Sequence, residues 1–575
     1  MPDFTTPSYE EWYQATVESL KGAPFEKLLT QTYEGIQLQP LYRQANIPHQ
    51  HTLPGKYPYV RGTDDVTHPW AIAQETLKPD FENGQTAINL VVKTPDDLMA
   101  ALKGIDITGI PLFIRADEAS YDLALMLQNT NQLTGWIAYD PLRILAEKGT
   151  LSMRLEQAYN QMADLLKWSI MDAPNMDVIG VHTDVYHNGG ANAVQELAFA
   201  LATGVAYIRQ MTLARSFDLD VTVSKMRFGF AIGGNFFMEV AKLRAARLLW
   251  AQIVKAFGGG EAAQKMKIHA STGMVNKTVL DPYVNMLRTT IEGLAGAVGG
   301  VDSMHIAPFD ALFQQPDEFS SRIARNQQII LQNECNLTSL IDPAGGSWYV
   351  EALTDQLAKA AWELFQEIEA QGGMLKSLKD GFPQAQIEQV AAQRTENLAK
   401  RKDVLIGVNI HPNMSDELPP MPEASTPKDT PFKPVKPYRA AEPFEKLRYA
   451  TAKHPASIFL ANMGALRQYK ARADFAKGFY EISGCNIINP AGFDTPEQAA
   501  DAALESGAGA VVICSTDETY TELVPPFVKR LKAANPPTVV ILAGYPQDPL
   551  EAHQAARVAA VIHLRANRSQ RTAQL

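Results

Sequence analysis

Short apolar runs alternate with amphipathic helical patterns over most of the chain. Residues 110–115 (I-P-L-F-I-R) and 176–182 (M-D-V-I-G-V-H) are two of the runs, and each has the length of a buried strand. Residues 239–257 form one of the helical patterns, with apolar positions on one stripe and charged positions off it. Because the alternation continues from about residue 35 to about residue 407, it predicts an α/β fold with parallel strands, most simply a (β/α)8 barrel.

A proline-rich stretch separates this region from a second alternation. Residues 411–437 contain eight prolines among serine, threonine, aspartate and lysine, which is typical of a semi-extended linker. Beyond it, short apolar runs separated by helical patterns predict a small, doubly wound, flavodoxin-like sheet. The strands that we expect in this sheet are residues 458–461, 510–514, 539–542 and 561–564.

These patterns divide the chain into four predicted parts. The parts are an N-terminal arm at residues 1–34, the barrel at 35–410, the linker at 411–440 and the second domain at 441–575. The arm has helical spacing over residues 9–21, so we expect either a frayed terminus or a segment that wraps a partner subunit.

Composition narrows the class of protein. Of the 575 residues, 46% are hydrophobic and 20% are charged, which is ordinary for a soluble globular protein. The net charge of −11 argues against a nucleic-acid partner. We expect no secretory signal and no membrane span, because the N-terminus lacks a basic segment followed by an apolar one and no run of about 18 apolar residues occurs. A cytoplasmic protein fits these features best.

Generic site motifs are missing from the sequence. The three cysteines are scattered, so we expect buried thiols rather than a disulfide framework or a zinc site. There is no G-x-x-x-x-G-K-[ST] phosphate loop and no H-E-x-x-H zinc helix. Residues 258–260 (G-G-G) follow a helical pattern and are interpreted as its C-terminal stop. These features predict no metal site and indicate only a two-domain α/β enzyme or a relative of one.

Several stretches match a known family in the same order along the chain. They are Y-V-R-G at residues 59–62 with Pro69-Trp70, F-M-E-V-A-K-L-R-A-A-R at 237–247, G-G-V-D-S-M-H at 299–305, R-I-A-R-N at 322–326 and P-A-G-G-S-W-Y-V-E at 343–351. Together they resemble the substrate domain of the methylmalonyl-CoA mutase family. The resemblance implies a barrel in which coenzyme A threads the axis. It also implies an isomerase reaction in which adenosylcobalamin, held by the second domain, supplies the radical.

Residues 457–478 resemble the start of the family's cobalamin-binding domain. In that domain a strand runs into D-x-H-x-x-G, and the histidine ligates cobalt. Here Leu466, Gln468 and Ala471 stand at the Asp, His and Gly positions. Two further positions on the cofactor side also differ, with Asp517 in place of an apolar residue and Ala543 in place of a glycine. The resemblance therefore implies that this chain itself binds no cobalamin.

Tyr186 and His187, in the sequence D-V-Y-H-N-G-G-A, match the family's Tyr-His pair that meets the substrate thioester. They precede an amphipathic helix that starts near Asn192, and a helix N-terminus favours a negative oxygen. The pair is a candidate catalytic remnant. An alternative interpretation is that it closes a strand–helix loop by hydrogen bonds.

Other positions of the barrel depart from the family pattern. Ala138 replaces a glutamine, Lys148 stands where the family has an arginine, and His68 lies in a shortened loop that lacks the family's tyrosine. Lysine can pair with a carboxylate but lacks the planar fork of arginine. Lys148 is also interpreted as a solvated charge at a helix end, and His68 as an exposed loop residue.

Some members of this family are heterodimers. Their large chain binds cobalamin and reacts, whereas their small chain has the same fold and does neither. This chain resembles the small chain, which implies that it assembles with and stabilises a homologous large subunit that interconverts methylmalonyl-CoA and succinyl-CoA. Two alternatives stay open: an active acyl-CoA mutase with a divergent site, and a non-enzymatic acyl-CoA-binding protein.

Overall fold

Eight parallel strands close into a barrel in the computed structural model, which describes residues 7–47, 52–75, 81–130, 132–420, 430–544, 558–563 and 566–567. The strands are β3 (Ala71–Gln74), β4 (Ala87–Val91), β5 (Pro111–Arg115), β6 (Thr134–Tyr139), β7 (Asn175–His182), β8 (Met226–Ile232), β9 (Ile268–Thr272) and β10 (Ser303–His305). They follow one another around the barrel in chain order, and β10 pairs with β3 to close it. The predicted (β/α)8 barrel is confirmed.

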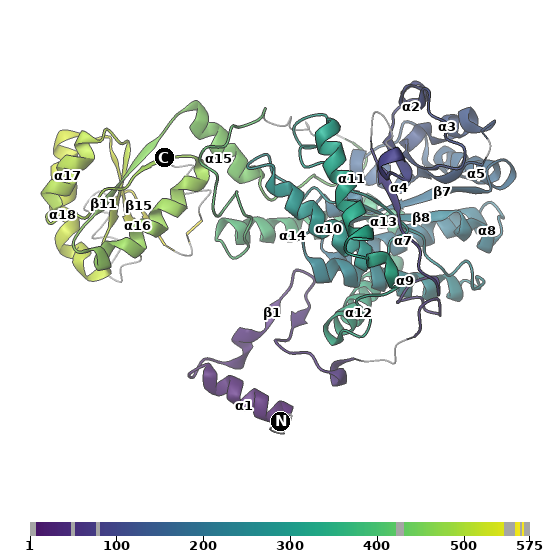
Figure 1. Ribbon diagram of the computed structural model, residues 1–575, viewed down its shortest axis with the longest axis horizontal. Helices are drawn as coiled ribbons and strands as arrows, with labels where there is room; N and C mark the ends of the chain where they lie inside the picture. The colour runs from purple at the N-terminus through teal and green to yellow at the C-terminus, as the bar shows by residue number, and fades with distance from the viewer. Residues whose placement is uncertain are drawn as a thin grey trace.

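Helices surround the barrel strands (Figure 1). They are α2 (Pro95–Leu102), α3 (Ser120–Leu127), α4 (Pro141–Lys148), α5 (Leu155–Met171), α6 (Asp184–His187), α7 (Ala193–Thr212), α8 (Leu219–Ser224), α9 (Phe236–Ala256), α10 (Val284–Val298) and α11 (Glu318–Asn333). Three more complete this part of the chain, α12 (Trp348–Ala370), α13 (Met374–Asp380) and α14 (Phe382–Ala399). The glycines at residues 258–260 follow the end of a helix, as predicted. Helix α9 ends at Ala256, and Gly258 has a positive φ of 91°.

Side chains alternate along each strand between the core that lies under the helices and the inside of the barrel. On β5, Leu112 and Ile114 join the large core between strands and helices. Phe113, between them, belongs instead to a small cluster with Trp136 and Ala138 inside the barrel. The inward positions therefore decide whether the barrel axis is open.

The C-terminal domain is a five-stranded parallel sheet in the order β12-β11-β13-β14-β15. Its strands are β11 (Ser457–Asn462), β12 (Asn486–Ile488), β13 (Ala510–Cys514), β14 (Val539–Ala543) and β15 (Ala560–Ile562). On one face lies α16 (Leu466–Tyr480), and on the other lie α17 (Pro496–Glu505) and α18 (Tyr520–Ala534). The flavodoxin-like prediction is confirmed. The short strand β12 was not predicted, and Leu564 of the last predicted strand lies outside the described residues.

The N-terminal arm extends away from the barrel (Figure 1). Its helix α1 (Tyr9–Ser19) begins with a Ser8 capping box and contains no buried residue. Two short antiparallel strands follow, β1 (Thr30–Gln31) and β2 (Gln37–Leu38). The helical prediction for the arm is confirmed, and its first six residues lie outside the described ranges.

Part of the predicted linker lies along the carboxyl end of the barrel. The backbone N–H groups of Phe432, Val435 and Tyr438 donate to carbonyl oxygens of Gly149, Ala146 and Asn188. The next helix is α15 (Glu442–Lys453), and Figure 1 shows the C-terminal sheet standing to one side of the barrel beyond it. The predicted domain limits at residues 34, 410 and 440 stay predictions, and residues 421–429 lie outside the described chain.

Candidate functional site

Rings from opposite walls meet on the barrel axis. Phe113 lies on β5 and His269 on β9, four strands away in either direction around the closed barrel. Their ring centroids are 4.9 Å apart and their planes differ by 20°. Trp136 stacks on His182 with centroids 4.5 Å apart, and it also lies 6.0 Å from His269. All four side chains are buried, so the axis is closed at this level.

An ion cluster lies toward the amino end of the same axis. Asp177 of β7 accepts from Arg227 Nε at 2.9 Å and from Lys267 Nζ at 2.7 Å. The Arg227 guanidinium also lies 5.5 Å from the centroid of the Phe113 ring. The ion cluster and the rings therefore form successive layers across the barrel.

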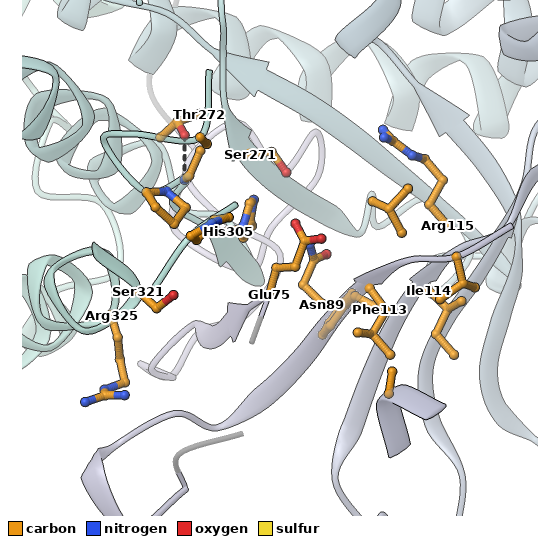
Figure 2. A pocket seen from close by; sticks show the side chains of 18 of the residues that line it. Glu75, Asn89, Phe113, Ile114, Arg115, Ser271, Thr272, His305, Ser321 and Arg325 are labelled. Carbon is orange, nitrogen blue, oxygen red and sulfur yellow. Dashed lines mark hydrogen bonds between the residues drawn. The ribbon is translucent and has the colours of Figure 1, made fainter. Parts of the chain in front are cut away.

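A cavity of about 1700 Å³ lies above these layers at the carboxyl end of the barrel (Figure 2). Its inner wall includes Asn89, Arg115, Ser271 and His305 from four barrel strands, together with Glu75, which follows β3. Residues of α2 and α11 also line it, and Figure 2 shows Ser321 and Arg325 of α11 beside it. Its volume exceeds that of a common small-molecule site.

The polar groups of this cavity are of mixed charge. Burial, with the nearby charge of Arg115, lowers the pKa of His305 to about 4, so its imidazole is neutral at pH 7. Burial also raises the pKa of Glu75. Arg115 donates to Asp184 at 2.8 Å, so this cavity-lining cation is already paired with a carboxylate of this chain. Arg322 and Arg325 of α11 also line the cavity, together with the carboxylates of Asp317 and Glu318. The arrangement does not single out an anionic substrate.

Tyr186 and His187 lie behind the cavity wall. Their neighbours Asp184 and Asn188 line the cavity, whereas neither member of the pair is among its described lining residues. Tyr186 is 1% exposed, its ring packs on Phe199 with centroids 5.1 Å apart, and burial raises its pKa.

His187 belongs to a buried ionic network. Its Nδ1 lies 3.2 Å from Glu196, which also accepts from Lys242 at 2.7 Å and from Thr183. These contacts are those expected of a loop-closing pair. The catalytic role of Tyr186 and His187 stays a prediction.

The other positions matched to the family lie outside the cavity or only in its wall. Lys148 is half exposed and pairs with Asp117 at 2.7 Å. His68 is exposed in its loop. Ala138 is part of the cavity wall and offers no polar group there. Arg143, beside them, is buried and pairs with Asp117, Glu147 and Asp184.

The carboxyl edge of the C-terminal sheet is the second candidate site, because ligands of doubly wound folds bind at such an edge. Gln468 Oε1 accepts from the backbone N–H of Ala465 at 2.8 Å, so this amide caps its own helix. Leu466 is 60% exposed, and Ala471 is exposed as well.

Arg472 fills the edge beside them. Its Nη1 donates to Asp517 Oδ1 at 2.8 Å and to the carbonyl oxygen of Ala543 at 2.8 Å. Its guanidinium also lies 5.2 Å from the centroid of the Tyr520 ring. A Cβ added to Gly544 would overlap the guanidinium, so no free space separates Arg472 from that backbone.

The comparisons with known proteins give the family. The methylmalonyl-CoA mutase family model matches residues 78–450. The chain belongs to the methylmalonyl-CoA mutase family. It is 34% identical to the methylmalonyl-CoA mutase small subunit of Porphyromonas gingivalis, over 91% of this chain and 90% of that one. It is 33% identical to the small subunit of Streptomyces virginiae, over 92% of this chain and 91% of that one. A methylmalonyl-CoA mutase of Cereibacter sphaeroides is 33% identical over 70% of this chain and 64% of its own length.

The cofactor implied by this mutase family is adenosylcobalamin, and the described edge does not fit it. The position of the cobalt ligand holds an amide that is bonded to its own helix. The space that a cofactor tail needs beside Gly544 is taken by Arg472. Across the described residues there is also no cluster of three His, Cys, Asp or Glu side chains suited to a metal ion. In the same part of the chain, no helix is long and apolar enough to cross a membrane.

Several residues of these two candidate sites were not predicted from the sequence. Arg115 and His305 end barrel strands, and Phe113 points inward on one of them. A charged or polar residue at the carboxyl end of an apolar run was the available signal for the first two. Arg472 directly follows Ala471, the position of the family's glycine, and this bulky neighbour was the signal for a filled edge.

Proposed function

We propose that this chain is the small subunit of a heterodimeric, adenosylcobalamin-dependent methylmalonyl-CoA mutase in the cytoplasm, and that it is itself non-catalytic. A homologous large subunit binds the cofactor and interconverts methylmalonyl-CoA and succinyl-CoA. The relatives that match this chain over about nine tenths of both lengths are named small subunits, which supports the proposal.

The contact between Phe113 and His269 carries the proposal. Rings from opposite walls touch on the axis, and Trp136 and His182 widen the same layer. The arm of coenzyme A that threads an active barrel would have to pass through this layer. A substrate that follows this route therefore cannot place its acyl group in the cavity above.

The chemistry of such mutases belongs mainly to the cofactor, which supplies the radical. The described residues at the edge of the C-terminal sheet offer it no ligand, because Gln468 and Arg472 are bonded within the domain. What the chain offers is a stable folded surface. A partner that binds only the folded state stabilises that state, and the gain is reciprocal between the two subunits.

The N-terminal arm is part of this proposed surface. Helix α1 has no buried residue, and its aromatic side chains cluster on themselves, with Tyr9 and Trp12 centroids 5.3 Å apart. Tyr13 packs on Phe25 with centroids 4.7 Å apart, which holds the helix against the following turn. Helix α1 is thus folded without burying a residue against the barrel, as expected of a segment that contacts a partner.

The test is cofactor binding by the purified chain. The chain is mixed with hydroxocobalamin, desalted and examined by visible absorption, first alone and then with its large partner. We expect the lone chain to be colourless and the complex to hold one cobalamin per pair of subunits. Stoichiometric cobalamin on the lone chain would contradict the proposal and favour an active mutase with a divergent site.

Calorimetry with coenzyme A and methylmalonyl-CoA tests the other alternative. We expect no heat of binding from the lone chain, because the ring layer closes the axis. Binding in the absence of a large subunit would favour a non-enzymatic acyl-CoA-binding protein.

A further inference from the structure

One side chain bonds to several segments at the carboxyl edge of the C-terminal sheet. Arg472 projects from α16, which follows β11, and reaches the loop after β13 and the end of β14. In this sheet β11 and β13 are neighbours. The strand order reverses between them, because β12 lies beyond β11 on one side whereas β14 and β15 continue from β13 on the other. That point is where doubly wound folds leave an open crevice for a ligand.

We propose that Arg472 is an internal occupant of this crevice, which ties α16 to the ends of β13 and β14 and keeps the domain closed without a bound ligand. The proposal goes beyond the assignment of the chain as a small subunit. It depends only on contacts within the C-terminal domain and would hold whether or not the barrel is catalytic.

The contacts of the guanidinium support this role. Nη1 reaches a carboxylate after β13 and a carbonyl oxygen at the end of β14, each at 2.8 Å. A guanidinium is a planar group with several donors, so it can join such acceptors while its face lies over an aromatic ring. Here that ring is Tyr520, at 5.2 Å. The side chain of Arg472 is 24% exposed, so the tie is partly shielded from water.

The surrounding polar groups also bond within the protein. The Tyr520 hydroxyl donates to the carbonyl oxygen of Ala543 and accepts from the N–H of Ser515 at 3.1 Å. Ser515 Oγ donates to the carbonyl oxygen of Met463 at 3.1 Å. The ends of β11, β13 and β14 are therefore linked by hydrogen bonds, with Arg472 as the outermost one. This edge offers a ligand few free groups until Arg472 moves.

Amide hydrogen exchange of the full-length chain tests the proposal. In Arg472→Ala, we expect the amides of residues 515–520 and 543–544 to exchange at least tenfold faster than in the unmodified chain, because the local opening loses its outermost restraint. Arg472→Met keeps a long side chain but has no donors, so it should show the same acceleration. The control is Arg467→Ala, an exposed arginine on the same helix, which should stay within twofold.

Exchange in Arg472→Ala and Arg472→Met that matches the unmodified chain would overturn the proposal. Acceleration in Arg472→Ala alone would also overturn it, because packing of the stem rather than the hydrogen bonds would then close the crevice. If Arg472→Ala does not fold, Asp517→Asn decides the matter. This change removes the charge of one partner, and we expect a smaller acceleration at residues 515–520. Unchanged exchange at residues 515–520 would contradict the proposal that Arg472 links these segments.

Discussion

The barrel axis and the edge of the C-terminal sheet are both filled, but by different numbers of side chains. Four rings from β5, β6, β7 and β9 close the axis, and each is buried. One partly exposed arginine from α16 closes the edge. The axis is closed by residues that also form the interior of the barrel. The edge is closed by the hydrogen bonds of one guanidinium at the surface of the domain. Closure should therefore be redundant in the barrel and should depend on a single residue in the C-terminal domain.

The strongest test of this difference is removal of one ring from the axis. Phe113→Ala deletes a buried aromatic side chain, and such a change costs about 3–5 kcal/mol in a packed core. We expect a large drop in the urea midpoint, read by tryptophan fluorescence. The signal reports the barrel and arm, because all seven tryptophans precede residue 363.

Phe237→Ala is the matched control, since Phe237 is 45% exposed and its loss should cost about 0.5 kcal/mol or less. Phe113→Ala should also fail to bind coenzyme A, because Trp136 still stacks on His182 and lies near His269. Coenzyme A binding by Phe113→Ala would show that barrel closure depends on one ring and would end the contrast. Unchanged stability would instead show that Phe113 is not part of a packed layer.

The sequence predicted the strands around both sites better than it predicted the side chains that fill them. Apolar periodicity located the strands at residues 510–514 and 539–542 to within one residue, because buried strands need continuous apolar side chains. The motif positions Leu466, Gln468 and Ala471 predict that the cobalt ligand is lost, and this stays a prediction. Closure of the barrel axis could not be predicted, because a contact between Phe113 and His269 joins residues far apart in sequence. It depends on barrel geometry rather than on any local pattern.

Lowering the pH should destabilise the barrel before the edge of the C-terminal sheet, because the barrel interior contains imidazoles whose pKa is lowered. The pKa of His305 in the folded chain is lowered to about 4, and that of His269 is also well below its usual range. An unfolded histidine has a pKa of about 6.5, so the folded state binds fewer protons between these values. The stability that this provides is complete above about pH 6.5 and is lost as the pH falls toward 4. We expect the barrel to lose about 1–3 kcal/mol for His305 over this window.

The measurement is the urea midpoint by tryptophan fluorescence from pH 7.5 to 4.5. His305→Asn should flatten the curve, because the asparagine does not titrate, whereas His454→Asn, at the exposed residue that follows α15, should leave it unchanged. By contrast, the described contacts of Arg472 are with Asp517, Ala543 and Tyr520, none of which is an imidazole. A pH dependence that is the same in His305→Asn and in the unmodified chain would contradict the burial of a neutral imidazole.

Restoring one cobalt ligand to the edge of the C-terminal sheet should have little effect on cobalamin binding. Gln468→His returns an imidazole to the position of the family's cobalt ligand, but Arg472 still overlaps the space beside Gly544. We expect the variant to be as colourless as the unmodified chain after incubation with hydroxocobalamin and desalting. Retention of the cofactor by Gln468→His would mean that Arg472 does not exclude it, and the edge would then be open rather than filled.

The smallest expected effect is on turnover of the assembled mutase. Tyr186→Phe removes a hydroxyl and keeps the ring that packs on Phe199, so the fold should be unchanged. If the barrel of this chain is inert, the variant complex should turn over within twofold of the unmodified one. Loss of a hydrogen-bond donor that acts on a substrate costs about 10²–10³-fold. A decrease of that size would return Tyr186 to the catalytic residues. It would also require that substrate reach the barrel by a path other than the axis, because Phe113 and His269 meet across it.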